Sequence, residues 1–338
     1  MGVKCYLGVD VGSVSTKLVA LGDGGDVLHS VYGRTEGAPI RALQIGLREL
    51  GAAIPGGMRV AGVGVTGSAR QLAGLVVGAD VVKNEITAQA AAARHVAPGA
   101  RTIIEIGGQD SKMITLKDGL VVDFAMNSVC AAGTGSLLDQ QAARLGIPIE
   151  ELGEYALRSR TPVNITGRCG VFAESEMIQK QQLGHRKEDI IAGLCEAVVR
   201  NYLSNLGRGK EILSPVLFQG GVAANVGVRA ALEKALGCEV TVPLHFKEMG
   251  AAGAALLARD EASNRIPLTG RQDSKFKGFG IAEADFRTST FICEDCSDRC
   301  EVVRIEQDGT LLGVWGCRCE KWSEAASRKR SKKPAAAQ

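Results

Sequence analysis

Apolar and polar positions alternate along the chain with two different periods, which predict an alternation of strands and helices. Short apolar runs rich in β-branched residues are typical of strands, and three of them open the chain at residues 4–10, 17–21 and 25–34. Helical spacing of apolar residues then predicts an amphipathic helix over 40–52. A strand, a glycine turn and a helix follow over 59–72, and a further helix is expected over 81–96.

The pattern starts again near residue 100, which indicates an internal duplication. The segments KCYLGVDVGSVSTKLVAL and ARTIIEIGGQDSKMITL share one layout: a strand, an acidic residue near a glycine, a polar turn, a lysine and a strand. Strands and helices continue to alternate afterwards, with strands over 215–223 and 239–243 and helices from Asn225 and over 247–262. We therefore expect an α/β protein of two similar lobes.

Changes in composition divide the chain further. We expect a first lobe at residues 1–98 and a second at 99–263, whose last helix can pack on the first lobe. A polar linker is expected over 264–287, a cysteine-rich module over 288–322 and a disordered basic tail over 323–338.

Composition and charge narrow the class of protein. Hydrophobic residues make up 45% and charged residues 23% of the chain, which excludes a wholly disordered protein. Apolar runs are too short for a membrane span and no secretory leader is visible, so we expect a cytoplasmic protein without a membrane partner. The formal net charge is +3, but five of the positive charges lie in the last dozen residues. No nucleic-acid partner is therefore expected.

Two glycine-rich turns, one in each lobe, predict a clamp for phosphate groups. Backbone N–H groups and hydroxyls in such turns bind anionic oxygens, and a nearby carboxylate can hold hydrated magnesium. In the first lobe Asp10 would hold magnesium, and the turn comprises Gly12, Ser13, Val14, Ser15, Thr16 and Lys17. In the second lobe the turn is Gly107 and Gly108, followed by Gln109 and Asp110, either of which could orient an attacking water.

A third turn, with Gly220, Gly221 and Asn225, ends a strand and opens a helix, where the backbone can approach an adenosine closely. The sequence contains neither G-K-[ST] nor G-x-G-x-x-G, so P-loop and dinucleotide-binding interpretations fail. Tight hairpins are the alternative role for each turn alone, but three such turns together favour a nucleotide site.

Cys130 and Cys169 each stand at the expected start of a helix, where oriented N–H groups stabilise thiolates or an anionic cluster. An iron–sulfur cluster needs four thiolates, which a two-fold dimer would supply. Two unrelated buried cysteines, or a zinc site completed by histidine or carboxylate, are the alternatives. Spacing alone leaves all three open.

The order of the motifs VDVGSVSTK, IGGQDSK, MNSVCAAGTGSLLD, GRCGVFAESEMI, GGVAANVGV and MGAAGAALLA resembles one family over roughly residues 4–260. This is the family of activators (component A) of 2-hydroxyacyl-CoA dehydratases, which includes the ATPase subunits of benzoyl-CoA reductases and the reductases of double-cubane-cluster proteins. The resemblance implies two ribonuclease-H-like lobes of the acetate kinase/sugar kinase/Hsp70/actin type that close on ATP and Mg²⁺. It also implies a homodimer with one [4Fe–4S] cluster, held by Cys130 and Cys169 of each chain.

Members of that family use ATP to drive a low-potential electron into a partner dehydratase or reductase, and ferredoxin or flavodoxin is the expected electron donor. The chain departs from the family pattern at Glu105, where aspartate is common, and in the segment HFKE before the last motif. The departure at HFKE leaves open which side chain reaches the adenine. A sugar or acyl kinase of the same fold, and an ATP-dependent sensor or scaffold, are the alternative functions.

The cysteine-rich module suggests a second metal site of four thiolates. Zinc with a structural role and a second iron–sulfur cluster that relays electrons are both compatible with the spacing, and free surface thiols are the third interpretation. The candidate ligands are Cys293, Cys296, Cys300, Cys317 and Cys319.

Overall fold

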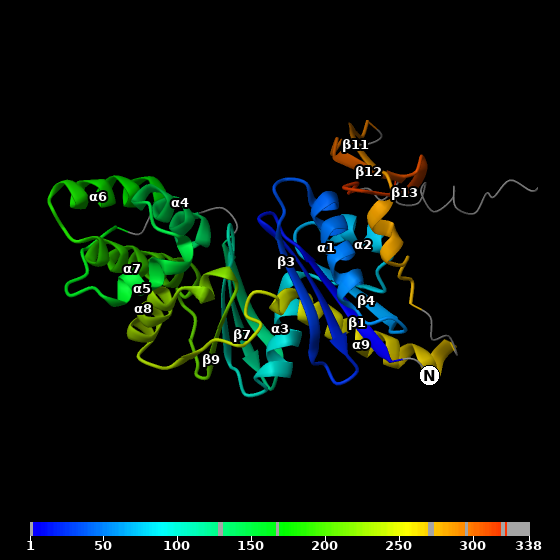
Figure 1. The fold of residues 1–338 in the computed structure, drawn as a ribbon, viewed down its shortest axis with the longest axis horizontal. Coiled ribbons are helices and arrows are strands. Elements are labelled where there is room, and N and C mark those ends of the chain that lie inside the picture. The colour runs from blue at the N-terminus through cyan, green and yellow to red at the C-terminus, as the bar shows by residue number, and fades with distance from the viewer. Residues whose placement is uncertain are drawn as a thin grey trace, which may run out of the picture.

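The computed structural model describes residues 3–127, 131–166, 169–269, 274–294, 297–318 and 322. They form two lobes that lie side by side, and a small three-stranded sheet packs on the outside of the first lobe (Figure 1). None of the described helices combines the length and the apolar character that a membrane crossing requires.

The first lobe is built on a five-stranded mixed sheet of order β3-β2-β1-β4-β5. Its strands are β1 (Lys4–Val11), β2 (Ser15–Gly22), β3 (Val27–Arg34), β4 (Arg59–Thr66) and β5 (Val81–Val82). The first three are antiparallel neighbours, whereas β4 is parallel to β1 and β5 to β4. The helices of this lobe are α1 (Pro39–Ala53), α2 (Arg70–Val77) and α3 (Glu85–Val96).

The second lobe repeats this topology, which confirms the duplication expected from the sequence. Its sheet reads β8-β7-β6-β9-β10, with an antiparallel trio followed by two parallel strands. The strands are β6 (Thr102–Ile106), β7 (Ser111–Lys117), β8 (Leu120–Asn127), β9 (Val216–Gln219) and β10 (Val240–Thr241). The helices are α4 (Gly135–Leu145), α5 (Leu152–Leu157), α6 (Gly170–Gln182), α7 (Lys187–Leu206) and α8 (Val226–Leu236).

Helix α9 (Met249–Thr269) follows the second lobe in sequence but packs on the sheet of the first (Figure 1). Small residues allow its backbone to approach closely: a Cβ on Gly8 of β1 would lie 1.8 Å from the Ala251 carbonyl oxygen. A Cβ on Gly253 would lie 1.8 Å from the carbonyl oxygen of Ala88 in α3. Helices α3 and α9 therefore form one tightly packed layer beside the cleft.

Two segments differ from the sequence-based expectations. The helix expected over 81–96 begins only at Glu85, because the two valines 81–82 pair with β4 and Asn84 caps the helix by accepting the Thr87 N–H at 2.9 Å. Part of the stretch expected as a linker packs on the first lobe, where the buried Ile281 joins the hydrophobic core.

The small sheet consists of β11 (Phe286–Ile292), β12 (Glu301–Gln307) and β13 (Thr310–Trp315), all antiparallel. It rests on α2, where a Cβ on Gly313 would lie 2.6 Å from the Leu75 side chain. Ile305 is fully buried in the first lobe's core cluster. The sheet is therefore anchored to the first lobe, whereas the basic tail at 323–338 lies outside the described residues.

Candidate functional site

The cleft between the lobes holds a cavity of about 450 Å³. It is lined by the glycine turns of both lobes and by the third turn before α8, so the structure brings together the three turns found in the sequence. The predicted residues that line it are Asp10, Gly12, Ser13, Val14, Ser15, Lys17, Gly107, Gly108, Gln109, Asp110, Gly220, Gly221 and Asn225.

Thr16 is the predicted site residue that does not line the cavity. Its hydroxyl is buried and lies 3.0 Å from the Thr35 hydroxyl, which in turn donates to the Gly12 carbonyl at 2.8 Å. Thr16 therefore supports the phosphate turn from behind, because its alternating position in β2 turns the side chain away from the cleft.

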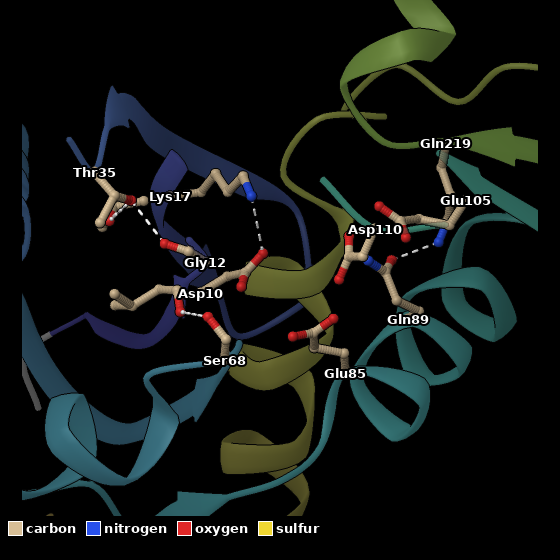
Figure 2. A network of polar contacts seen from close by, with 12 residues as sticks. Asp10, Gly12, Lys17, Thr35, Ser68, Glu85, Gln89, Glu105, Asp110 and Gln219 are labelled. Carbon is tan, nitrogen blue, oxygen red and sulfur yellow. Dashed lines mark hydrogen bonds and ion pairs between the residues drawn. The ribbon is translucent and has the colours of Figure 1, made fainter. Parts of the chain in front are cut away.

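The first lobe contributes a buried ion pair at the end of β1. Asp10 and Lys17 are opposite one another in the β1–β2 ladder, and Lys17 Nζ lies 3.3 Å from Asp10 Oδ2 (Figure 2). Burial is the largest single influence on the pKa of Lys17 and lowers it, but Asp10, Glu105 and Tyr32 together outweigh burial, so the net pKa is raised. The Lys17 ammonium thus faces the cavity in its charged form, beside the Asp10 side chain.

The second lobe repeats this pair at the same place in its own hairpin. Glu105 and Lys112 are opposite one another in β6 and β7, and their charged atoms are 3.0 Å apart. Lys112 Nζ also lies 2.8 Å from Asp110 and 2.7 Å from Glu85 of α3, so one buried ammonium contacts three carboxylates. Burial lowers the pKa of Lys112, but these carboxylates hold it well above its ordinary range.

Burial has the opposite effect on the acid of this pair. It raises the pKa of Glu105 to about 7, even though Lys112 opposes the shift. The cavity is lined by fewer basic than acidic residues, so its charges favour an added cation: Lys17, Arg34, Lys112 and Lys247 against Asp10, Glu85, Glu105, Asp110, Asp139 and Glu150. Carboxylate oxygens are ligands that Mg²⁺ prefers, so Asp10 and Asp110 could hold it between the two glycine turns.

The third turn offers contacts of another kind. Asn225 accepts the Val228 N–H at 3.0 Å and so caps α8, while its buried Nδ2 has no hydrogen-bond partner among the described residues. Gly220 has φ +89°, a backbone conformation that favours glycine, and a Cβ there would lie 2.5 Å from the Ile106 carbonyl oxygen. At the cavity wall the turn therefore offers the backbone of two glycines and one side-chain amide donor, the Nδ2 of Asn225.

Sequence reasoning missed the residues that reach the cavity from α3 and from the lobe edges. Glu85 and Gln89 of α3 face the second lobe, where Gln89 accepts a hydrogen bond from Gln219 (Figure 2). The duplication carried a signal for Glu105, since it occupies the position of Asp10 in the repeated hairpin. No local pattern distinguished Glu85, because tertiary packing alone brings α3 beside β7.

The helices that follow the Cys130 and Cys169 motifs, α4 and α6, lie side by side at the outer end of the second lobe (Figure 1). Gln140 of α4 donates to Glu174 of α6 at 3.1 Å, and a Cβ on Gly170 would lie 3.6 Å from Leu137 of α4. Cys169 is half-buried at the start of α6. Cys130 lies outside the described residues, four positions before Thr134, the N-cap of α4.

Helix α4 is also joined to the second glycine turn. The N–H groups of Gly135 and Ser136 donate to the carbonyl oxygens of Gly107 and Gly108 at 2.9 and 2.8 Å. The phosphate turn and the first turn of α4 therefore form one hydrogen-bonded unit.

The described C-terminal cysteines are Cys293, Cys300 and Cys317, whereas Cys296 and Cys319 lie outside the described residues. Across the described part of the chain, no three histidine, cysteine or acidic side chains form a group able to hold a metal ion. The described coordinates by themselves thus contain neither of the two metal sites expected from the sequence.

Comparisons with known proteins show which family and which relatives the chain is similar to. The family model described as "BadF/BadG/BcrA/BcrD ATPase family" matches residues 7–258. The (R)-2-hydroxyglutaryl-CoA dehydratase activating ATPase of Acidaminococcus fermentans is 37% identical over 261 residues, which cover 76% of this chain and 98% of that protein.

Solved structures show the same fold. The activator of the 2-hydroxyisocaproyl-CoA dehydratase from Clostridium difficile, with bound ADPNP, has a TM-score of 0.72 and 33% identity, covering 78% of this chain and 97% of that one. A xylulose kinase from Brucella ovis shares only the fold, with a TM-score of 0.51 and 13% identity, covering 77% of this chain and 90% of that one. The expected sugar kinase/actin-type fold is therefore confirmed.

Proposed function

Because the chain belongs to the BadF/BadG/BcrA/BcrD ATPase family, we propose that it is an ATP-hydrolysing activator. We further propose that it delivers a low-potential electron to a partner enzyme. The partner is a 2-hydroxyacyl-CoA dehydratase, a benzoyl-CoA reductase-like enzyme or a double-cubane-cluster protein, and ferredoxin or flavodoxin supplies the electron. The observation that carries the proposal is the pair of hydrogen bonds from Gly135 and Ser136 to the Gly107–Gly108 turn, because they connect the cleft to the start of α4, a few residues after Cys130 in the sequence.

The nucleotide part of the proposal rests on the cavity. ATP would lie between the lobes, with its phosphates at Gly12 to Ser15 and at Gly107–Gly108, and its nucleoside at Gly220–Gly221. The unpartnered Nδ2 of Asn225 is a donor for an acceptor on the nucleoside. Asp10 and Asp110 would hold Mg²⁺, which neutralises phosphate charge, and Gln109 or Asp110 would orient the attacking water.

The redox part of the proposal rests on the two cysteine motifs. Cys130 and Cys169 of two identical protomers would supply the four thiolates of one bridging [4Fe–4S] cluster. Contacts between α4 and α6 support this, because they hold the two motifs of one chain together. The side chains of Val171 and Phe172, next to Cys169, are 71% and 67% exposed, as expected for apolar residues that a second protomer covers.

The nucleotide site and the proposed cluster are coupled because the Gly107–Gly108 turn is hydrogen-bonded to α4, the helix that follows Cys130 in the sequence. Closure of the lobes on ATP moves the Gly107–Gly108 turn, and the start of α4 moves with it. A potential change of about 59 mV corresponds to about 1.4 kcal/mol for one electron, so small changes in burial or hydrogen bonding at the cluster alter its potential appreciably.

The coupling is tested by Ser136→Pro, which removes the N–H that donates to Gly108. Proline is tolerated in the first turn of a helix, so α4 is retained. Ser136→Ala is the matched control, because it also removes the hydroxyl, which donates to the same Gly108 carbonyl oxygen, but keeps the backbone N–H. We expect the proline variant to hydrolyse ATP but to reduce the partner at a rate lowered at least tenfold, and the alanine variant to resemble the wild type.

Anaerobic assays with ATP, reduced ferredoxin and the purified partner measure both rates. Partner reduction by the proline variant at the wild-type rate would contradict the coupling. Phosphorylation of a small acceptor with stoichiometric release of ADP, and no need of Cys169, would replace the proposal with a kinase.

A further inference from the structure

The wall of the cavity contains an ion pair between the two lobes that the proposed function does not use. Arg34 ends β3 of the first lobe, and Asp139 lies one turn into α4 of the second lobe. Both side chains line the cavity, and Arg34 Nη1 lies 3.9 Å from Asp139 Oδ2. This distance exceeds that of a hydrogen bond, and the two side chains are 60% and 42% exposed. The pair therefore holds the lobes together only weakly.

Arg34 is attached to the phosphate turn of the first lobe. It lies opposite Ser15 in the ladder between β2 and β3. The next residue, Thr35, donates its N–H to the Val14 carbonyl oxygen at 2.9 Å and its hydroxyl to the Gly12 carbonyl oxygen at 2.8 Å. These contacts join the end of β3 to the turn at two points. The long Arg34 side chain, which lines the same cavity, therefore lies within reach of a phosphate bound at this turn.

The other basic side chains around the cavity are engaged elsewhere. Lys17 Nζ lies 3.3 Å from a carboxylate oxygen, and Lys112 Nζ contacts three carboxylates at 3.0 Å or less. Neither can leave these partners without uncovering a buried charge. The Lys247 ammonium lies over an aromatic ring, 5.6 Å from its centroid. Arg34, by contrast, adjoins the phosphate turn and can leave its exposed partner for another anion.

We propose that Arg34 binds the terminal phosphate of ATP and releases Asp139 when it does so. This inference rests on the ATP-binding part of the proposed function and on no part of the electron transfer. With the nucleoside at Gly220–Gly221 of the second lobe, the phosphates extend toward the first lobe, and the terminal one comes closest to Arg34. A guanidinium donates two parallel hydrogen bonds to a phosphate, which outweighs a loose carboxylate contact. ADP lacks this phosphate, so with ADP the pair stays closed.

The exchange changes what holds α4. The first turn of α4 is hydrogen-bonded to the Gly107–Gly108 turn of its own lobe, and the Arg34–Asp139 pair attaches the same helix to the first lobe. ATP removes the second attachment and leaves the first. Because the coupling between two binding equilibria is reciprocal, a nucleotide that opens the pair must bind more tightly once the pair is absent.

Nucleotide titrations of the full-length protein test the exchange. The probes are ADPNP, an ATP analogue that keeps the terminal phosphate, and ADP, each titrated calorimetrically with Mg²⁺. We expect Arg34→Gln to weaken ADPNP binding at least tenfold and ADP binding less than twofold. Asp139→Asn should strengthen ADPNP binding about threefold, because Arg34 is then free for the phosphate. Arg144→Gln is the matched control and leaves both affinities unchanged, since this arginine of α4 pairs with Glu174 outside the cavity.

The double variant Arg34→Gln/Asp139→Asn separates the exchange from simple repulsion between Asp139 and the phosphates. When Asp139 acts through Arg34, its removal from the Arg34→Gln background leaves ADPNP affinity within 1.5-fold, whereas repulsion gives the same gain in both backgrounds. An equal gain, or an Arg34→Gln protein that binds ADPNP like wild type, would overturn the inference and leave the proposed function intact. A wild-type protein that binds neither nucleotide would overturn both. The expected affinities in a protein without iron would support the exchange and contradict the electron transfer.

Discussion

Removal of the Lys112 ammonium is the most informative perturbation of the buried charges in the cleft. Lys112→Met keeps the unbranched side chain up to the Cε position and leaves Glu85, Glu105 and Asp110 facing one another without the ammonium group. Loss of one partner from a buried ion pair destabilises a protein by about 3–5 kcal/mol. Glu85 and Asp110 retain 20% and 31% exposure, so water solvates them in part and the lower end of that range applies.

We therefore expect Lys112→Met to lower the free energy of unfolding by about 3 kcal/mol in nucleotide-free protein. Urea denaturation of wild type and variant measures the difference. Lys210→Met is the matched control, because Lys210 pairs with the exposed Asp123 and surface pairs contribute at most about 1 kcal/mol. Magnesium should recover more stability in the Lys112 variant than in wild type, since its cleft carries one more uncompensated negative charge.

A second substitution separates charge from packing. Glu105→Gln in the Lys112→Met background removes the most buried of the three carboxylates, and should restore part of the lost stability. A Lys112 variant that is as stable as the wild type, or a double variant less stable than Lys112→Met alone, would refute this account of the cluster.

Two further predictions concern pH and close packing. Burial raises the pKa of Glu105 to about 7, so the stability that this group contributes is complete below its unfolded pKa of about 4.3 and is lost as the pH rises through 7. Relative to wild type, Glu105→Gln should therefore gain about 3 kcal/mol between pH 4.5 and 8, and parallel unfolding profiles would contradict this. Gly253→Ala places a Cβ 1.8 Å from the Ala88 carbonyl oxygen and should lower the free energy of unfolding by about 1–3 kcal/mol, whereas Gly280→Ala, in open space, should be neutral in the same melts.

The architecture could be predicted from the sequence where local signals and the duplication agree. The layout shared by the hairpins of Asp10 and Glu105 predicted two similar lobes, and both sheets have the same topology. The glycine turns predicted the cavity wall for the same reason, since a turn at a strand end is fixed by nearby residues. The same reasoning placed Thr16 at the cavity, but its side chain points away from it, because neighbouring residues of a strand face opposite sides of the sheet.

Residues placed by tertiary packing could not be predicted. Glu85 contacts Lys112 because α3 and α9 pack tightly beside the cleft, and nothing in the local sequence of either partner indicates the other. The polar stretch before β11 suggested a linker by composition, yet Ile281 is buried in the first lobe. Few apolar residues suffice there because the receiving surface, on α1 and α2, is itself apolar.

Iron content and subunit mass, measured together on anaerobically reconstituted protein, test whether the protein carries a bridging cluster. We expect a homodimer with one [4Fe–4S] cluster, hence about two iron atoms per protomer, and a colourless product after Cys169→Ser or Cys130→Ser. A wild-type protein that stays monomeric and free of iron, or a Cys169→Ser protein with its full iron content, would contradict it.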